Sequence, residues 1–107
     1  MLHPANIFKN LPESFPEGEQ FDELLSRGGV TIERIISDGH KTPEGQWLCS
    51  GKNEWVVVLE GEGILEFSQN SPVRLARGDY CFIPAGCKHR VADTSQSEKT
   101  IWLAIHF

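Results

Sequence analysis

Few side chains in this sequence could perform chemistry near neutral pH. They comprise four histidines and three cysteines: His3, His40, His89, His106, Cys49, Cys81 and Cys87. Imidazoles and thiolates bind divalent metal ions, and an imidazole can also act as a general acid or base near pH 7. Three cysteines cannot all pair within one chain, and no Cys-x-x-Cys occurs, so we do not expect a disulfide scaffold.

The position of each of these groups depends on the strand that carries it. In the C-terminal two thirds of the chain the apolar residues follow a period of two, which is typical of β-strands. In one such strand Glu54 shares a face with Val56 and Val58. A carboxylate on an apolar face is costly to bury unless a metal, a cation or a hydrogen-bonded histidine accompanies it.

The elements that carry these residues are mostly short strands. Eight are expected, over residues 30–36, 46–50, 54–60, 64–68, 73–76, 80–83, 88–92 and 100–107. Ten glycines and six prolines supply turns between them. Short strands at roughly ten-residue spacing predict an all-β sandwich or barrel.

Residues 1–29 differ in pattern from the rest of the chain. Residues 1–19 show no clean periodicity and are expected to form an arm that lies on the body of the protein. Phe21, Leu24 and Leu25 follow at helical spacing, with Gly28 and Gly29 behind them, which predicts a short helix over residues 20–27. We therefore expect an arm with a short helix over residues 1–29 and a single β domain over residues 30–107.

Composition excludes several classes of protein. The chain has 107 residues, and 10 Lys and Arg against 15 Asp and Glu give a net charge of −5. This balance argues against a nucleic-acid partner, which calls for a basic face. No apolar run approaches the ~20 residues of a membrane helix, and residues 1–10 lack the regions of a signal peptide. We expect a cytoplasmic protein without a membrane partner.

Two segments together resemble the motif pair of the cupin superfamily. The second cupin motif, G-x5-P-x-G-x2-H-x3-N, is similar to the segment with Gly78, Pro84, Gly86 and His89, which ends at Asp93 where the motif has Asn. The second half of the first motif, E-x6-G, is similar to the segment from Glu54 to Gly61. The resemblance implies a jelly-roll barrel (a double-stranded β-helix) of the small, single-domain cupin-2 type.

The first motif departs from the cupin pattern. Cupins usually carry H-x-H shortly before the glutamate, and the two possible registers place Trp47 and Cys49, or Leu48 and Ser50, at those positions. The usual set of three histidines and one glutamate is therefore absent. The resemblance leaves Glu54 and a second-motif histidine pointing into the barrel.

Three other residues are candidates to complete a metal site with Glu54 and His89. Cys49 stands where the second histidine of H-x-H would be, His40 lies in a polar loop, and His106 ends the last strand. With one or two of these, the site would bind Fe, Zn, Mn or Ni. Iron would suit oxygenase chemistry, and zinc or manganese would suit lyase or isomerase chemistry.

Several functions remain open from the sequence. A metal-dependent cupin would act on or bind a small molecule in a pocket lined by Trp47, Val56, Val58 and Trp102. A metal-free binding module would use the same walls with Glu54 and His89 as polar anchors. A metal-free isomerase or epimerase would use a histidine paired with a carboxylate as its base. The resemblance also implies a homodimer, and the identity of the small molecule stays open.

Overall fold

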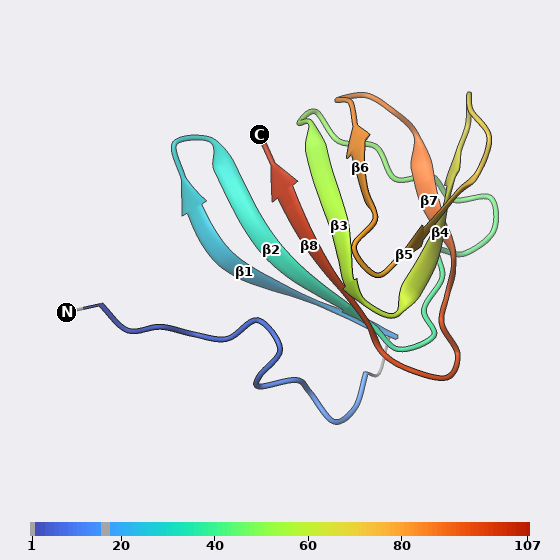
Figure 1. The fold of residues 1–107 in the computed structure, drawn as a ribbon. Helices are drawn as coiled ribbons and strands as arrows, with labels where there is room; N and C mark the ends of the chain where they lie inside the picture. The colour runs from blue at the N-terminus through green and yellow to red at the C-terminus, as the bar shows by residue number, and fades with distance from the viewer. Residues whose placement is uncertain (1, 16–17) are drawn as a thin grey trace.

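The computed structural model describes residues 2–15 and 18–107, and Figure 1 shows their arrangement. The all-β prediction is confirmed, because the described residues form eight strands and no helix. The strands are β1 (Glu19–Arg27), β2 (Val30–Ser37), β3 (Glu54–Glu60), β4 (Glu62–Phe67), β5 (Val73–Ala76), β6 (Tyr80–Ile83), β7 (His89–Thr94) and β8 (Thr100–His106). None of the described residues belongs to a helix that could cross a membrane.

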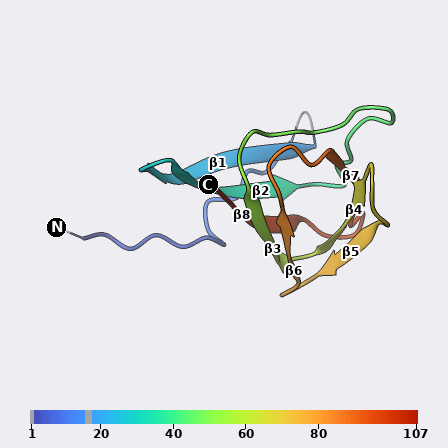
Figure 2. The same cartoon turned by 90° about the horizontal axis from the view of Figure 1, so that it is seen from above.

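The strands form two antiparallel sheets. The five-stranded sheet has the order β1-β2-β8-β3-β6, and the three-stranded sheet has the order β5-β4-β7. Figure 2 shows the three-stranded sheet facing β3 and β6. The chain passes between the sheets at a tight turn at Gly61, between β3 and β4.

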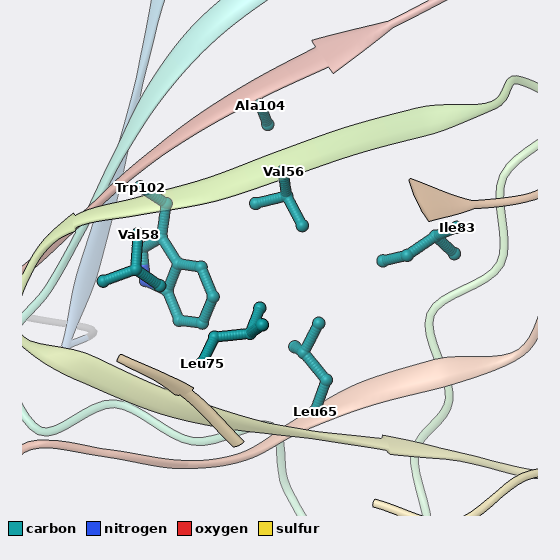
Figure 3. Close-up of a cluster of buried hydrophobic side chains, with 7 residues drawn as sticks. All are labelled: Val56, Val58, Leu65, Leu75, Ile83, Trp102 and Ala104. Atoms are coloured by element: carbon teal, nitrogen blue, oxygen red, sulfur yellow. The ribbon is translucent and has the colours of Figure 1, made fainter. Parts of the chain in front are cut away.

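Both sheets contribute side chains to one apolar core, shown in Figure 3. We call it the core cluster: Val56, Val58, Leu65, Leu75, Ile83, Trp102 and Ala104. The indole of Trp102 is 3% exposed, and its Nε1 donates a hydrogen bond to Ser37 Oγ at 3.2 Å. Its polar edge is therefore satisfied inside an otherwise apolar layer.

The helix expected over residues 20–27 is wrong, because this segment is strand β1. It pairs with β2, and the register shifts between Glu23 and Leu25, so Leu24 is the extra residue of a β-bulge. The bulge breaks the alternation of apolar residues and produces a spacing that resembles a helix. Gly28 and Gly29 both have positive φ, +58° and +82°, and form a two-residue hairpin turn rather than a helix end.

The strand expected over residues 46–50 is reduced to one isolated bridge. Leu48 pairs with His89, with N–H···O distances of 2.7 and 3.0 Å. Earlier in the same loop, the Thr42 amide donates to the Val91 carbonyl at 2.8 Å. The loop that leads from β2 to β3 is thereby fastened to β7 in the other sheet.

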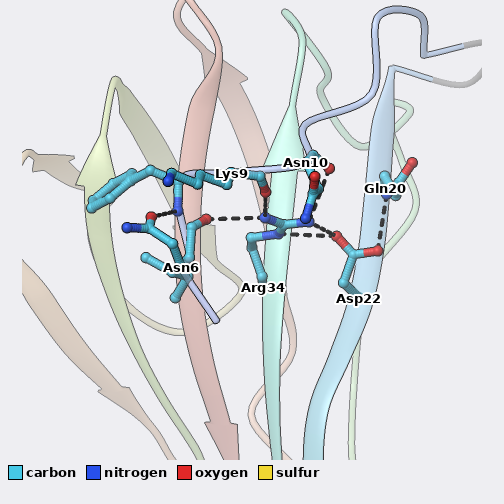
Figure 4. A network of polar contacts seen from close by, with 8 residues as sticks. Asn6, Lys9, Asn10, Gln20, Asp22 and Arg34 are labelled. Atoms are coloured by element: carbon cyan, nitrogen blue, oxygen red, sulfur yellow. Dashed lines mark hydrogen bonds and ion pairs between the residues drawn. The ribbon is translucent and has the colours of Figure 1, made fainter. Parts of the chain in front are cut away.

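A buried arginine ties the N-terminal arm to the five-stranded sheet, as Figure 4 shows. Arg34 on β2 is 7% exposed. Its Nη1 donates to the carbonyls of Ile7 at 3.0 Å and Lys9 at 2.7 Å, and its Nη2 lies 2.7 Å from Asp22 Oδ2. The arm is thus held through its backbone carbonyls by one guanidinium that a carboxylate orients.

The turn at Gly61 gives the first testable prediction. At φ +79° an added Cβ would lie 2.5 Å from Thr100 Oγ1 and 2.8 Å from Thr100 Cα. Gly86 has nearly the same φ, +80°, but no heavy atom within 4 Å of the added Cβ. We expect Gly61→Ala to lower the free energy of unfolding by about 3 kcal/mol or more, and Gly86→Ala by about 1–2 kcal/mol. Urea denaturation of the two variants measures this, and equal losses would contradict the predicted steric collision.

Candidate functional site

A cavity of about 600 Å³ opens between the two sheets. The core cluster forms one boundary of the cavity. Four of its residues also line the cavity: Val56, Leu65, Ile83 and Trp102. Side chains of β1, β2, β3, β7 and β8 form its walls, and the loop from β2 to β3 adds residues between His40 and Ser50. A cavity of this size, apolar with a few polar groups, is typical of small-molecule sites.

Three polar groups converge inside the cavity. Glu54 on β3 and His106 on β8 are direct cross-strand partners, and His89 reaches them from β7 in the facing sheet. Glu54 Oε1 lies 4.0 Å from His89 Nε2 and 3.9 Å from His106 Nδ1. The cavity thus has one polar centre, where a carboxylate stands between two imidazoles.

Hydrogen bonds hold the outer nitrogen of each imidazole. His89 Nδ1 donates to the Cys87 carbonyl at 3.0 Å, and His106 Nε2 donates to Glu33 Oε1 at 2.9 Å. A carbonyl and a carboxylate can only accept, so these two nitrogens carry the protons. In its neutral form each imidazole therefore directs a lone pair toward Glu54.

The spacing of the centre leaves room for one more atom. Distances of 3.9 and 4.0 Å are too long for a direct hydrogen bond between Glu54 and either imidazole. If an oxygen atom lay about 2.8 Å from the Glu54 carboxylate oxygen and from one imidazole nitrogen, the angle between these two atoms at the added oxygen would be roughly 90°, which suits hydrogen bonding. For a metal ion about 2.1 Å from the same two atoms, the angle at the metal would be roughly 140°. This is wider than a tetrahedral angle, so the carboxylate and the imidazole would have to move closer together to hold the ion.

The carboxyl of Glu54 is perturbed by its surroundings. Burial raises its pKa, while His106 and His89 lower it and Glu33 raises it further. The net direction is upward, and the side chain is 15% exposed. A carboxyl whose pKa is raised by burial is suited to exchange a proton with a bound molecule nearer neutral pH.

His40 and Cys49 line the cavity but do not join its polar centre. His40 Nε2 lies 3.3 Å from Glu19 Oε2, and the thiol-bearing Cys49 is exposed. Within residues 2–15 and 18–107, no group of three or more His, Cys, Asp and Glu side chains has the arrangement of a metal site. A metal ion bound by Glu54 and His89, with one or two of His106, Cys49 and His40, stays a prediction.

The four expected wall residues divide into two groups. Trp47, Val56 and Trp102 line the cavity, and the Trp47 side chain is 40% exposed. Val58 does not line it and is a correction to the expected pocket: it is fully buried in the core cluster. Val58 is on the same face of β3 as Val56, but it lies two residues closer to the Gly61 turn, inside the core cluster.

Glu33 contacts the polar centre through His106 and was not among the site residues predicted from the sequence. The available signal was its position in β2, where it shares a face with Ile35, which also lines the cavity. A carboxylate on an apolar face requires a partner, but β2 and β8 are about 70 residues apart in sequence. Only the pairing of β2 with β8 brings Glu33 to His106.

Comparison with known families and structures supports the same fold. The family model described as "Cupin domain" matches residues 40–106. A crystal structure from Ralstonia eutropha JMP134, of a protein provisionally named mannose-6-phosphate isomerase, is 42% identical; the match covers 98% of this chain and 97% of that one, with a TM-score of 0.92. No curated protein matches the sequence.

Two more distant structures share the fold alone. A cupin superfamily protein from Desulfitobacterium hafniense DCB-2 is 17% identical, covers 100% of this chain and 93% of its own, and has a TM-score of 0.76. An RmlC-like cupin with a double-stranded β-helix fold from Methanocaldococcus jannaschii is 16% identical, with 99% and 91% coverage and a TM-score of 0.71. The expected jelly-roll architecture is therefore confirmed.

The raised pKa of Glu54 predicts how its replacement changes stability with pH. The folded chain binds this proton more tightly than the unfolded chain, so ionisation lowers stability as pH rises above the ordinary glutamate value of 4.5. We expect Glu54→Gln to raise the free energy of unfolding at pH 7–8, with the gain disappearing as the pH falls toward 4.5. Urea denaturation at several pH values measures this gain.

The control for this prediction is Glu44→Gln, which removes a carboxylate from an exposed loop position. Its effect reports only the loss of one negative charge from a chain of net charge −5. If Glu54→Gln destabilised the protein at pH 8, or gained stability no more than Glu44→Gln, burial of the Glu54 carboxylate would not carry the expected cost.

Proposed function

The chain belongs to the Cupin domain family, and from this premise we propose that its cavity binds a small organic molecule through an oxygen atom held among Glu54, His89 and His106. The observation that carries the proposal is the spacing of these three groups. Two imidazole nitrogens stand 3.9 and 4.0 Å from one carboxylate oxygen. That spacing matches a bound oxygen better than direct contact between the groups.

The same centre supports proton transfer at the bound oxygen. A neutral imidazole accepts a hydrogen bond from a hydroxyl, and a protonated one donates to a carbonyl. Glu33, at 2.9 Å from His106, stabilises the imidazolium that forms when His106 takes up a proton. The Glu54 carboxyl, whose pKa is raised by burial, is the second group that can give or take a proton at this point.

Acid–base chemistry of this kind is what an isomerase or epimerase requires. Isomerisation of a hydroxy-carbonyl compound moves one proton away from carbon or oxygen and returns one to a neighbouring atom. The neighbour from Ralstonia eutropha JMP134, 42% identical over nearly the whole chain, carries a provisional isomerase name. Proton transfer on a small hydroxylated molecule is therefore the reaction class that we propose for this cavity.

A divalent metal ion at the same three residues is the second candidate, and the outer hydrogen bonds favour it. Histidines that bind metals commonly donate their other N–H to a carbonyl or carboxylate, as His89 and His106 do here. The donor chemistry fits an ion of the Fe, Zn, Mn or Ni class, and Glu54, His89 and His106 would hold it. Such an ion would supply a Lewis acid that polarises a ligand oxygen.

Substitution of the two imidazoles tests the binding proposal. A fragment library is screened by ligand-observed NMR on the intact chain, and the dissociation constants of the hits are measured. Because both imidazoles lie beside the proposed position of the bound oxygen, we expect His89→Ala and His106→Ala each to weaken binding about 10- to 100-fold. Glu33→Gln, which acts through His106, weakens it less. The control is His3→Ala in the exposed arm, and hits that bind all four variants equally would contradict the proposal.

Metal analysis tests the second candidate. Protein purified without a histidine tag is analysed for metals, and its melting temperature is recorded with added Mn, Fe, Ni or Zn. A resident ion predicts about one equivalent and a melting temperature that rises with metal concentration. Glu54→Gln and His89→Ala should abolish both effects, while Cys49→Ser should leave them. Metal far below one equivalent, with no thermal shift, would count against this candidate.

A further inference from the structure

The charged residues of the cavity restrict what it can bind. We infer that the cavity takes an uncharged or cationic small molecule and excludes phosphate esters and other anions, so that its ligand differs from the sugar phosphate in the name of the Ralstonia eutropha JMP134 protein. This inference rests on the proposed function in its metal-free form, in which the cavity binds a small molecule directly through Glu54, His89 and His106. It names the chemical class of that molecule, which neither the fold nor the polar centre specifies.

Among the described residues, the cavity lining carries three carboxylates and no side chain with a fixed positive charge. The acidic residues are Glu19, Glu33 and Glu54, and the residues that can become cationic are His40, His89 and His106. Neither Lys nor Arg occurs among the described residues that line the cavity. With its carboxylates ionised, the lining therefore reaches a charge of zero at most, three positive against three negative, even if every imidazole is protonated.

The two arginines nearest in sequence to lining residues are directed away from the cavity. Arg34 follows Glu33 on β2, and strand alternation turns it to the outer face, where it binds Asp22 and the arm. Arg90 follows His89 on β7, and its guanidinium lies 3.3 Å from Glu66 and 2.8 Å from the Thr42 carbonyl. The two side chains are only 9% and 12% exposed, and neither Arg34 nor Arg90 is among the described residues that line the cavity.

An anion would also lack the backbone groups that commonly bind phosphate. Phosphates are held by Arg and Lys side chains or by the free N–H groups at a helix N-terminus. The described residues form no helix, and the lining has no such side chain. A phosphate placed beside Glu54 would meet a carboxylate flanked by two imidazoles, and while these are neutral the carboxylate repels the phosphate in a partly desolvated site.

The residues at the mouth of the cavity favour a positively charged ligand. Phe21 and Trp47 line it and are 56% and 40% exposed, and Glu19 lies two residues from Phe21 on the same face of β1. Aromatic faces beside carboxylates attract ammonium groups through cation–π and Coulomb interactions. An amine or an uncharged polyol therefore meets favourable or neutral surroundings from the mouth to the polar centre.

Cys49 provides a native reporter of the potential inside the cavity. It lines the wall and is exposed, so small thiol reagents can reach it. We compare a cationic and an anionic methanethiosulfonate of similar size, dividing each rate by that of the same reagent with free 2-mercaptoethanol. Mass spectrometry assigns the modified cysteine. We expect the cationic reagent to react about 10-fold faster in low salt after this correction, and the preference to fall toward one at 0.5 M salt.

Two sets of variants separate the cavity from the charge of the whole chain. Cys49→Ser with Ser71→Cys moves the reporter to the exposed turn between β4 and β5, where we expect little preference beyond that of a chain of net charge −5. Glu19→Gln and Glu33→Gln should each reduce the preference measured at Cys49. An equal or faster corrected rate for the anionic reagent at Cys49 would overturn the inference.

The ligand screen distinguishes failure of this inference from failure of the proposed function. Matched sets such as mannose, mannosamine and mannose 6-phosphate are included in the screen. Hits dominated by phosphate esters or carboxylates that are lost in His89→Ala would overturn the charge preference and support the binding site. Uncharged or cationic hits that are lost in His89→Ala support both claims.

Discussion

The burial of one carboxylate is the constraint on which the site depends. Glu54, the first residue of β3, enters the space between the two sheets, and its side chain is only 15% exposed. Burial raises its pKa, and the molecule compensates only in part, with two imidazoles at about 4 Å rather than in direct contact. A carboxylate held in this way is costly to stability. The bound oxygen that we propose would offset part of this cost by completing the environment of the carboxylate.

The filled and open ends of the barrel follow from the distribution of large side chains. Trp102 and Val58 fill the space near the Gly61 turn, where the sheets are joined. Away from this turn, at the first residue of β3 and the last residue of β8, the inward residues are the polar Glu54 and His106, and the cavity lies there beside the core cluster. The fastening of the loop before β3 to β7 holds one wall of that cavity in place. The core cluster and the polar centre of the cavity are therefore built from neighbouring segments of the same strands, β3 and β8.

Strand alternation also sorts the charges. Neighbouring residues on β2 place Glu33 in the cavity and Arg34 on the outer face, where it anchors the N-terminal arm. On β7 the same rule separates His89 from Arg90. The result is a cavity with carboxylates and imidazoles inside and guanidiniums outside. Arg34 and Arg90 thus stabilise the arm and the loop before β3, and they add no positive charge to the cavity lining.

The sequence by itself determined the strands β2 to β8 and the turns at the motif glycines, although it added a strand over residues 46–50 that the structure reduces to a single bridge. These elements follow from local alternation and from glycine and proline at turns, and such patterns need no knowledge of distant contacts. The expectation that Glu54 and His89 point inward came instead from the resemblance to the cupin motifs, and both residues line the cavity. Sequence periodicity misassigned β1, because a bulge at Leu24 imitates helical spacing, and it extended a wall to Val58, because alternation assigns a face but not a depth. Only the tertiary structure decided that His106, rather than His40 or Cys49, stands beside Glu54, and that Glu33 supports it. The physical reason is that strand order and register are set by pairing between segments far apart in the chain, and no local pattern encodes which residues then lie opposite one another.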